Sequence, residues 1–149
     1  KNIYKKYFIN KFYLPKINLE FSKYLTKLAN TSIDISDGLL IDLNKMINAQ
    51  HLSSEIYYDK IPISNKLKIF LRKNSLEKNK FIFNGDDYQI LFTSSKTNRQ
   101  QIDKISQKTK TKISRIGKIL PKKKFKLRLL KGDKMVKMTK IPGYEHFFT

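Results

Sequence analysis

Two carboxylates and a hydroxyl lie within four residues of one another between Asp34 and Gly38, where a short apolar strand is expected to turn into a helix. Asp34 and Asp37 offer the hard oxygen ligands that Mg²⁺ prefers, and the free N–H groups and dipole of a helix N-terminus favour an anion in front of it. Ser36 or Asp37 can also cap the helix. The segment therefore predicts a site for a metal-bound phosphate, although an isolated motif of this kind is more often only a strand end and a helix cap.

A second acidic cluster lies at residues 84–88 and separates two apolar runs, 81–83 and 90–92, which we expect to be strands. Adjacent carboxylates such as Asp86 and Asp87 are costly unless a cation or a hydrogen-bond donor compensates their charge. The alternative is a hydrophilic hairpin turn, for which Asn-Gly and Gly-Asp are ordinary signals.

A third segment, residues 143–147, has the sequence Gly-Tyr-Glu-His-Phe and follows a proline. By itself it is most simply an aromatic plug over the core. The order of the three segments is more informative than any one of them.

Read together, the three segments resemble the thiamine-monophosphate kinase family. The family pattern D-[VIL]-S-D-G-L-x-x-D-L is matched at residues 34–43, and G-G-E-D-Y-x-L-L-F-T is matched at 84–93, with Asn84 in place of the first glycine and Asp86 in place of the glutamate. Shorter matches lie at 13–15, 55–57, 61–64, 116–119 and 143–147. The resemblance covers about residues 13 to 148.

The resemblance implies an α/β fold, namely the three-layer α/β/α C-terminal domain of the aminoimidazole-ribonucleotide-synthetase-like fold, with a mixed sheet and partial ferredoxin-like topology. It implies ATP-dependent phosphorylation of thiamine monophosphate to thiamine diphosphate, with Mg²⁺ as cofactor and ATP as co-substrate. Another ATP-dependent enzyme of the same superfamily, a purine-pathway or selenophosphate synthetase, is the alternative.

Carried over residue by residue, the resemblance implies that Asp34 and Asp37 bind magnesium and that Ser36 contacts ATP. Asp86 and Tyr144 would contact thiamine monophosphate. The shorter Asp86 would need a small backbone shift or a bridging water to make a contact of the family's glutamate. No side chain is needed as a catalytic base, because the attacking phosphate oxygen is already anionic. Asp42 and Asp87 are left as either structural or supporting residues.

Kinases of this family also have an N-terminal half with further acidic ligands, which nothing here matches, and the chain starts at Lys1 rather than Met. We therefore expect residues 1–17 to be a basic aromatic lead-in to a missing domain and 18–149 to be the C-terminal domain, inactive alone. The family's homodimers predict the same state for the complete enzyme.

The formal net charge of +20 suggests nucleic-acid binding as a different class of function. However, only four of the 32 basic residues are arginine, and the lysines are spread along the whole chain, which argues against specific readout. The run Lys122-Lys123-Lys124 with Lys126 is expected to be a solvated loop. The chain has no cysteine, no apolar stretch of membrane-spanning length and no signal-peptide pattern, so we expect a cytoplasmic protein without nucleic-acid or membrane partners.

Apolar spacing predicts the remaining elements. The expected helices lie at about 18–29, 39–47, 67–71 and 97–108, and the expected strands or extended segments at 32–36, 55–59, 112–119, 125–130 and 134–139, with a hairpin turn at 131–133.

Overall fold

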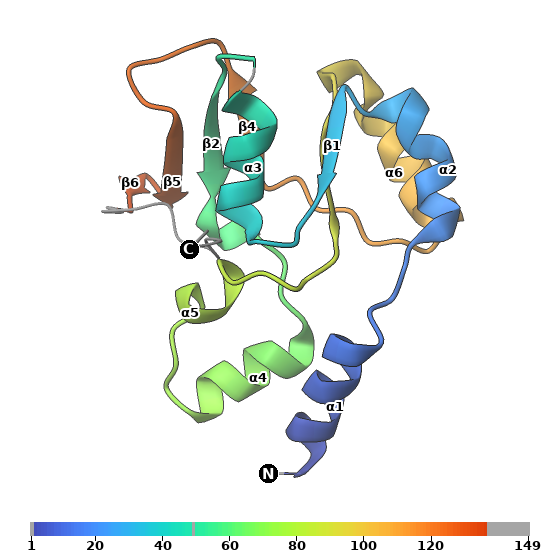
Figure 1. The fold of residues 1–149 in the computed structure, drawn as a ribbon, viewed down its shortest axis with the longest axis vertical. Coiled ribbons are helices and arrows are strands. Elements are labelled where there is room, and N and C mark those ends of the chain that lie inside the picture. Colours follow the sequence, from blue (N-terminus) through green and yellow to red (C-terminus); the bar gives the residue numbers. More distant parts are fainter. Residues whose placement is uncertain (1, 49, 137–149) are drawn as a thin grey trace, which may run out of the picture.

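The computed structural model describes residues 2–48 and 50–136 and has an α/β fold (Figure 1). The helices are α1 (Asn2–Tyr13), α2 (Leu19–Leu28), α3 (Leu39–Asn48), α4 (Asn65–Lys73), α5 (Asn79–Ile82) and α6 (Arg99–Lys108). The strands are β1 (Thr31–Asp34), β2 (Ser53–Tyr57), β3 (Ile90–Thr93), β4 (Gly117–Leu120), β5 (Leu127–Lys131) and β6 (Lys134–Met135). Two short 3₁₀ turns, η1 (Tyr58–Lys60) and η2 (Lys96–Asn98), complete the described elements.

The strands form two sheets. β1 and β3 make an antiparallel pair in which Ile33 lies opposite Leu91. The second sheet has the order β4-β2-β5-β6, with β2 and β5 parallel and the other two pairs antiparallel. The expected mixed sheet is therefore confirmed.

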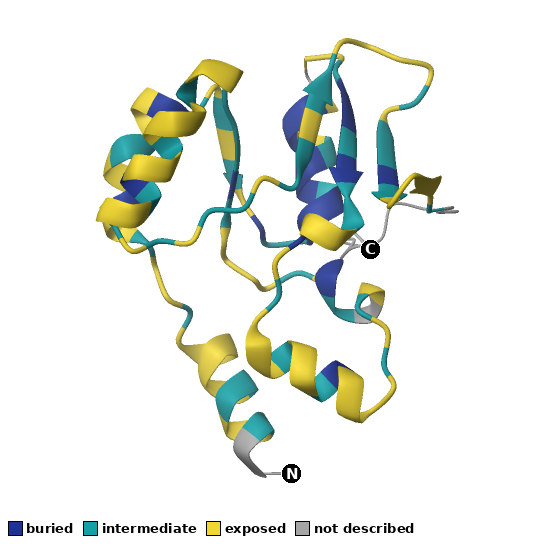
Figure 2. Cartoon of the chain, turned by 180° about the vertical axis from the view of Figure 1, so that it is seen from behind, coloured by how far each residue is buried: buried dark blue, intermediate teal, exposed yellow. Residues whose placement is uncertain are grey.

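Helix α3 forms the centre of the hydrophobic core. The apolar residues predicted to share one helix face are all buried, namely Leu39, Leu40, Leu43, Met46 and Ile47 (Figure 2). They pack with Leu91 from the first sheet and with Ile56 and Leu129 from the second. One buried helix face thereby joins the two sheets, and the helix begins beside the first acidic segment.

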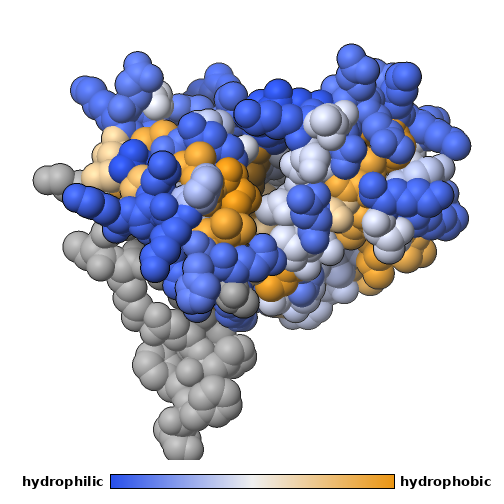
Figure 3. Space-filling model, turned by 90° about the horizontal axis from the view of Figure 1, so that it is seen from above, coloured by the Kyte–Doolittle hydropathy of each residue, from blue (hydrophilic) through white to orange (hydrophobic). Residues whose placement is uncertain are grey.

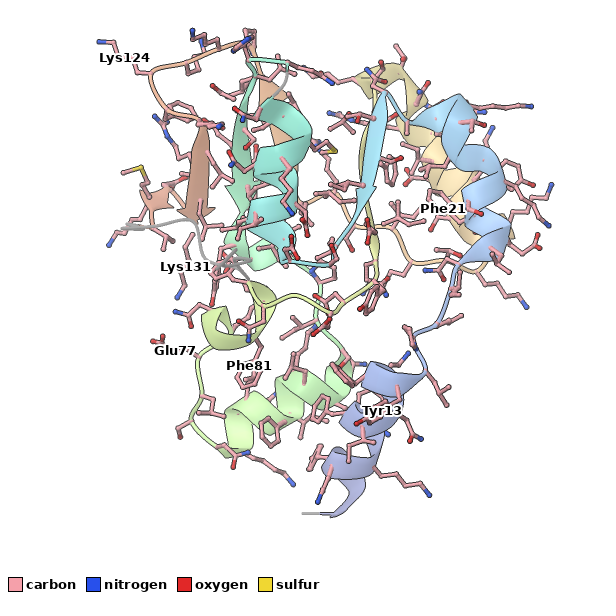
Figure 4. The ribbon with its side chains drawn as sticks, viewed as in Figure 1. Tyr13, Phe21, Glu77, Phe81, Lys124 and Lys131 are labelled. Atoms are coloured by element: carbon pink, nitrogen blue, oxygen red, sulfur yellow. The ribbon has the colours of Figure 1, made fainter. Side chains whose placement is uncertain are left out.

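The opposite side of the β1–β3 pair is covered by α2 and α6. The ring of Phe92 lies 5.6 Å from that of Phe21 on α2, and Phe21 packs in one cluster with Leu28 and with Ile105 of α6 (Figure 4). Along β3, Leu91 thus belongs to the cluster around α3 and Phe92 to the cluster around α2 and α6, as the alternation of side chains in a strand requires. Helices on both sides of this sheet give the expected α/β/α layers.

The expectation of a strand at residues 81–83 is wrong, because this run forms helix α5 and the end of its turn. Ile82 and Phe83 enter the main core, while the Phe81 ring lies 6.5 Å from Phe70 on α4 (Figure 4). The helical turn thus distributes three consecutive apolar residues over two packing sites. A short apolar run cannot be assigned to strand or helix from periodicity alone.

The basic aromatic lead-in is mostly helical, since α1 fills residues 2–13, which sequence patterns left without an element. The rings of Tyr4 and Phe8 lie 5.9 and 5.7 Å from Phe70. These aromatic contacts hold α1 against α4, at the lower end of the molecule in Figure 1. Most of the α1 surface is exposed (Figure 2).

The C-terminal strands agree with expectation in order but are shorter. Strand β4 begins only at Gly117, where a Cβ would lie 2.2 Å from the Glu55 carbonyl oxygen of β2. The hairpin turn is confirmed, with Gly132 at φ +56° between β5 and β6, and the expected extension of the last strand runs beyond the described residues. Among the described helices, none has the length and apolarity to cross a membrane.

Candidate phosphate and metal site

The two acidic segments are held together by backbone hydrogen bonds. We call residues 34–38 the first acidic loop and residues 84–89 the second. Beyond the end of the β1–β3 pairing, the Ile35 N–H donates to Gln89 O and the Tyr88 N–H donates to Ile35 O, both at 2.9 Å. The Asp86 N–H then donates to Ser36 O at 2.9 Å. Ser36 and Asp86, expected to contact different substrates, are thereby neighbours.

Two glycines permit this close approach. A Cβ on Gly85 would lie 2.0 Å from the carbonyl oxygen of Ser36, and a Cβ on Gly38 would lie 2.3 Å from the carbonyl oxygen of Phe83. Gly38 also has φ +129°, which side chains rarely tolerate. Since each obstructing atom belongs to the backbone, neither can rotate aside. Each loop therefore requires a glycine where the other loop crosses it.

Asp42, in the first turn of α3, fixes the shape of the first acidic loop. Its Oδ2 accepts hydrogen bonds from the backbone N–H groups of Ser36, Asp37 and Gly38 at 3.0, 3.0 and 3.1 Å. The Asp42 side chain is only 1% exposed. The carboxylate that closes this turn is therefore that of Asp42, and these three N–H groups already have an anion.

Lys45, one turn further along α3, carries the compensating positive charge. Its Nζ forms an ion pair with the Asp37 carboxylate and lies 3.1 Å from Asp42 Oδ1. The hydrogen bond to Asp37 is the main cause of a raised pKa of Lys45, so its ammonium group stays charged throughout the neutral range. Asp37 is mostly covered, with 16% of its side chain exposed.

The second acidic loop has an unusual backbone. Asp86 and Tyr88 have φ values of 63° and 49°, in the left-handed region that costs a non-glycine residue about 1 kcal/mol or more. The Tyr88 hydroxyl donates to Asp86 Oδ1 at 3.2 Å, and this bond, together with the Asp86 charge, raises the pKa of Tyr88. The charge of Asp34 contributes to the same shift, which places Asp34 within electrostatic range of this loop.

Asp87 lies beside Asp86 and its ionisation is disfavoured. Desolvation is the main cause of the raised pKa of Asp87, and the negative charge of Asp86 adds to it. The residue as a whole is exposed, so solvent limits the effect of this desolvation on the carboxyl. A bound cation would reverse this disfavoured ionisation.

Negative charge is concentrated at these loops in an otherwise basic protein. Five of the twelve acidic residues belong to the site, namely Asp34, Asp37, Asp42, Asp86 and Asp87. Within the part of the chain that the structure describes, no three potential ligands are grouped closely enough to hold a metal ion alone. Mg²⁺ usually takes only one or two protein carboxylates and completes its shell with phosphate oxygens and water, so the donor set fits magnesium carried with a phosphate.

The structure brings four of the five predicted site residues into one region. Asp34 is exposed at the end of β1, while Ser36 and Asp37 follow in the first acidic loop and Asp86 is bound to that loop through its backbone. Tyr144 lies outside the described residues. Sequence patterns missed Lys45, although its spacing of three from Asp42 on a helix is a recognisable signal for an ion pair.

A family model described as AIR synthase related protein, C-terminal domain, matches residues 15–130. The chain belongs to this family, whose C-terminal domain it carries. Its relatives include thiamine-monophosphate kinases from Buchnera aphidicola subsp. Acyrthosiphon pisum, 34% identical with 99% of this chain and 46% of the relative covered, and from Aquifex aeolicus, 39% identical with 55% and 27% covered. The chain therefore spans less than half the length of these relatives.

Solved structures agree with this assignment. The structure of AaThiL complexed with AMPPCP and TMP has a TM-score of 0.78 and 27% identity, with 99% of this chain and 43% of that chain covered. T. maritima PurL complexed with ATP has a TM-score of 0.61 at 11% identity, over 80% of this chain and 19% of that one, and therefore shows the shared fold alone.

Proposed function

We propose that this chain is the C-terminal half of a thiamine-monophosphate kinase, which transfers the terminal phosphoryl group of ATP to thiamine monophosphate and forms thiamine diphosphate. The observation that carries the proposal is the interlocked pair of acidic loops, joined through Ser36, Gly38 and Gly85. The named relatives and the AaThiL complex with AMPPCP and TMP support this choice of substrates.

The chemistry suits the residues present. The nucleophile is a phosphate oxygen that is anionic near neutral pH, so no side chain has to remove a proton, and the main obstacle is repulsion between two anions. Magnesium supplies the charge compensation when it is bound. The chain's part is to hold its carboxylates still, which Asp42 does by fixing the backbone of residues 36–38.

We assign Asp34 and Asp37 to magnesium, Ser36 to ATP, and Asp86 and Tyr144 to thiamine monophosphate. Asp34 and Asp37 flank Ser36 on the first acidic loop, while Asp86 lies on the second, so metal, nucleotide and acceptor would meet where the loops cross. Asp42 is not a ligand in this proposal, because it is buried and already accepts three backbone hydrogen bonds. Asp87 is assigned no ligand role.

The complete enzyme would contain an N-terminal half with further metal and nucleotide contacts, and would be a cytoplasmic homodimer. Residues 1–17 would be the lead-in from that half, and residues 18–149 would form the C-terminal domain. The 149-residue chain alone should therefore form little thiamine diphosphate. Steady turnover of ATP and thiamine monophosphate by the purified chain would contradict this division.

The test uses the complete enzyme with Asp37→Asn, which keeps the size of the side chain but removes its charge. We expect kcat to fall by roughly a hundredfold or more, because a few kcal/mol of transition-state stabilisation are lost. Asp103→Asn is the matched control, since Asp103 is exposed on α6, away from the acidic loops. Turnover within about twofold of the control at saturating Mg²⁺ would show that Asp37 has only a structural role.

Tyr144→Ala tests the acceptor side of the same proposal. A ring that contacts thiamine monophosphate should raise KM for that substrate much more than KM for ATP when it is removed, at a cost of about 1–3 kcal/mol. A large fall in Tm with an unchanged KM would instead make Tyr144 a core residue.

A further inference from the structure

Among the residues that the structure describes, Lys45 is a cation at the site that the proposed reaction does not explain. Its ammonium group contacts the carboxylate of Asp37, which is assigned above as a magnesium ligand, and also contacts Asp42. A positive side chain beside a metal ligand would normally weaken metal binding by repulsion. Any role of Lys45 must therefore allow a magnesium ion to bind the same Asp37 carboxylate.

The three side chains differ sharply in their freedom to move. The Asp42 side chain is 1% exposed and held by three backbone N–H groups, so it cannot follow a ligand. The Lys45 side chain is 49% exposed and ends a flexible four-carbon stem. Asp37 lies between these extremes on the loop that Asp42 shapes. Of the groups in this cluster, Lys45 is the one that can withdraw into water.

The energetic balance also permits a withdrawal. An ion pair with a solvent-exposed lysine contributes only about 0–1 kcal/mol, and salt screens it further. A divalent cation that arrives with a phosphate has twice the charge and displaces the ammonium group without uncovering a buried charge. The Lys45 contact with Asp42 Oδ1 can persist, because that oxygen is separate from the Oδ2 used by the loop.

We propose that Lys45 is a positioning residue that holds Asp37 as a tethered counter-ion and releases it to the divalent cation when the metal and its phosphate bind. The inference rests on the proposed magnesium role of Asp37. While the metal is absent, the ion pair keeps the Asp37 carboxylate turned toward α3 and prevents repulsion from Asp42. When the metal arrives, the ammonium group moves away from Asp37 and remains near Asp42.

The test measures binding of Mn²⁺, used as a probe for Mg²⁺, to the complete enzyme in the presence of a non-hydrolysable ATP analogue, by electron paramagnetic resonance, because the described residues do not hold a metal ion alone. Lys45→Met removes the charge and retains a good helix former, and Lys104→Met removes one charge from an exposed position on α6. We expect Lys45→Met to bind Mn²⁺ about two- to fivefold more tightly than Lys104→Met, the gain from removing one competing ion pair. Equal or weaker binding by Lys45→Met would overturn the proposal.

A double variant separates exchange from a general effect of charge. In an Asp37→Asn background, Lys45 has no carboxylate to release, so adding Lys45→Met should change Mn²⁺ affinity no more than adding Lys104→Met does. A gain as large as in the wild-type background would mean that Lys45 acts only through the net charge of the site, and would contradict the exchange.

Side-chain ¹⁵N NMR of the wild-type chain gives an independent reading that needs no variant. During a Mg²⁺ titration with a non-hydrolysable ATP analogue present, the Lys45 ammonium signal should shift with the same midpoint as the Asp37 backbone amide. Movement of Asp37 without movement of Lys45 would overturn the exchange but leave the magnesium assignment intact. If neither signal moves, the magnesium role of Asp37 is wrong, and the exchange is wrong with it.

Discussion

The acidic loops and the lysine loop, which comprises residues 121–126, both contain several side chains of like charge. The two regions differ in how those side chains are held. At the acidic loops, backbone hydrogen bonds and two glycines lock the carboxylates onto two crossing segments, buried Asp42 fixes the first loop, and Lys45 supplies the compensating positive charge. In the lysine loop, the side chains diverge into solvent, and Lys124 points away from the molecule (Figure 4).

Ser53 holds the backbone of the lysine loop, and the Phe125 ring packs under the Arg128 guanidinium at 3.7 Å. Buried Ser53 donates to Phe125 O at 2.7 Å and accepts from the Lys123 N–H at 2.8 Å. Hydrophilic side chains cover most of the face seen from above in Figure 3, which is what a solvated surface of lysines produces. Like charges that two rigid, hydrogen-bonded segments hold close together favour the binding of a counter-ion. Like charges on side chains that extend into water mainly increase solubility.

Of the substitutions considered in the acidic region, Asp42→Ala should cause the largest loss of stability. Three backbone N–H groups and Lys45 would lose their acceptor, so we expect the free energy of unfolding to fall by about 3–5 kcal/mol in urea denaturation. Asp103→Ala, at an exposed helix position, should change it by about 0.5 kcal/mol or less. A similar small effect at Asp42 would mean that the loop holds its shape without this carboxylate.

A substitution that forces the two acidic loops apart should lower the free energy of unfolding slightly less than Asp42→Ala does. Gly85→Ala places a methyl group 2.0 Å from a backbone oxygen, and we expect a loss of about 2–3 kcal/mol, because the loops must move apart. Gly132→Ala is the control, since nothing lies within 4 Å of the added Cβ, and its φ of +56° adds a backbone strain that Gly85 does not have. That control should lose only about 1 kcal/mol. Equal losses would show that the crossing is not tightly packed.

Substitutions in the lysine loop test whether its charges contribute to stability. Replacing Lys122, Lys123, Lys124 and Lys126 together by Gln should change the free energy of unfolding by about 0.5 kcal/mol or less, because the side chains are exposed. Ser53→Ala should cost more, about 1–2 kcal/mol, since it leaves two backbone groups without their partner. A large loss from the lysine replacements would mean that these charges have a structural counter-ion.

The smallest expected effect is a pH dependence at Asp87. Its raised pKa means that the folded state binds a proton more tightly than the unfolded state, so ionisation costs stability as the pH rises through the folded-state pKa. Asp87→Asn should therefore be more stable than wild type by only a few tenths of a kcal/mol at about pH 7, because solvent screens this exposed group, and the difference should vanish below about pH 3, where both states are protonated. A difference that is constant with pH, as Asp103→Asn should give, would remove the electrostatic cause.

Sequence patterns predicted most of the elements because their apolar spacing is regular, as on α3, and the acidic motif lies where it was expected. They failed at residues 81–83, where a short apolar run contributes side chains both to the main core and to the contact with Phe70. They left the role of Asp42 open, because its bonds to residues 36–38 depend on how the loop folds back over the helix. They also could not show that Gly38 and Gly85 face backbone atoms of the other loop, since that contact is tertiary.

The central claim is that the two acidic loops form one cation-binding region, and paramagnetic broadening by Mn²⁺ tests it most directly. In NMR spectra of the complete enzyme with a non-hydrolysable ATP analogue present, the backbone amides of residues 35–38 and 84–89 should broaden together at the lowest Mn²⁺ concentrations, while those of residues 122–126 stay sharp. Broadening confined to one loop, or no stronger than that near exposed carboxylates such as Glu20 and Asp103, would contradict the claim.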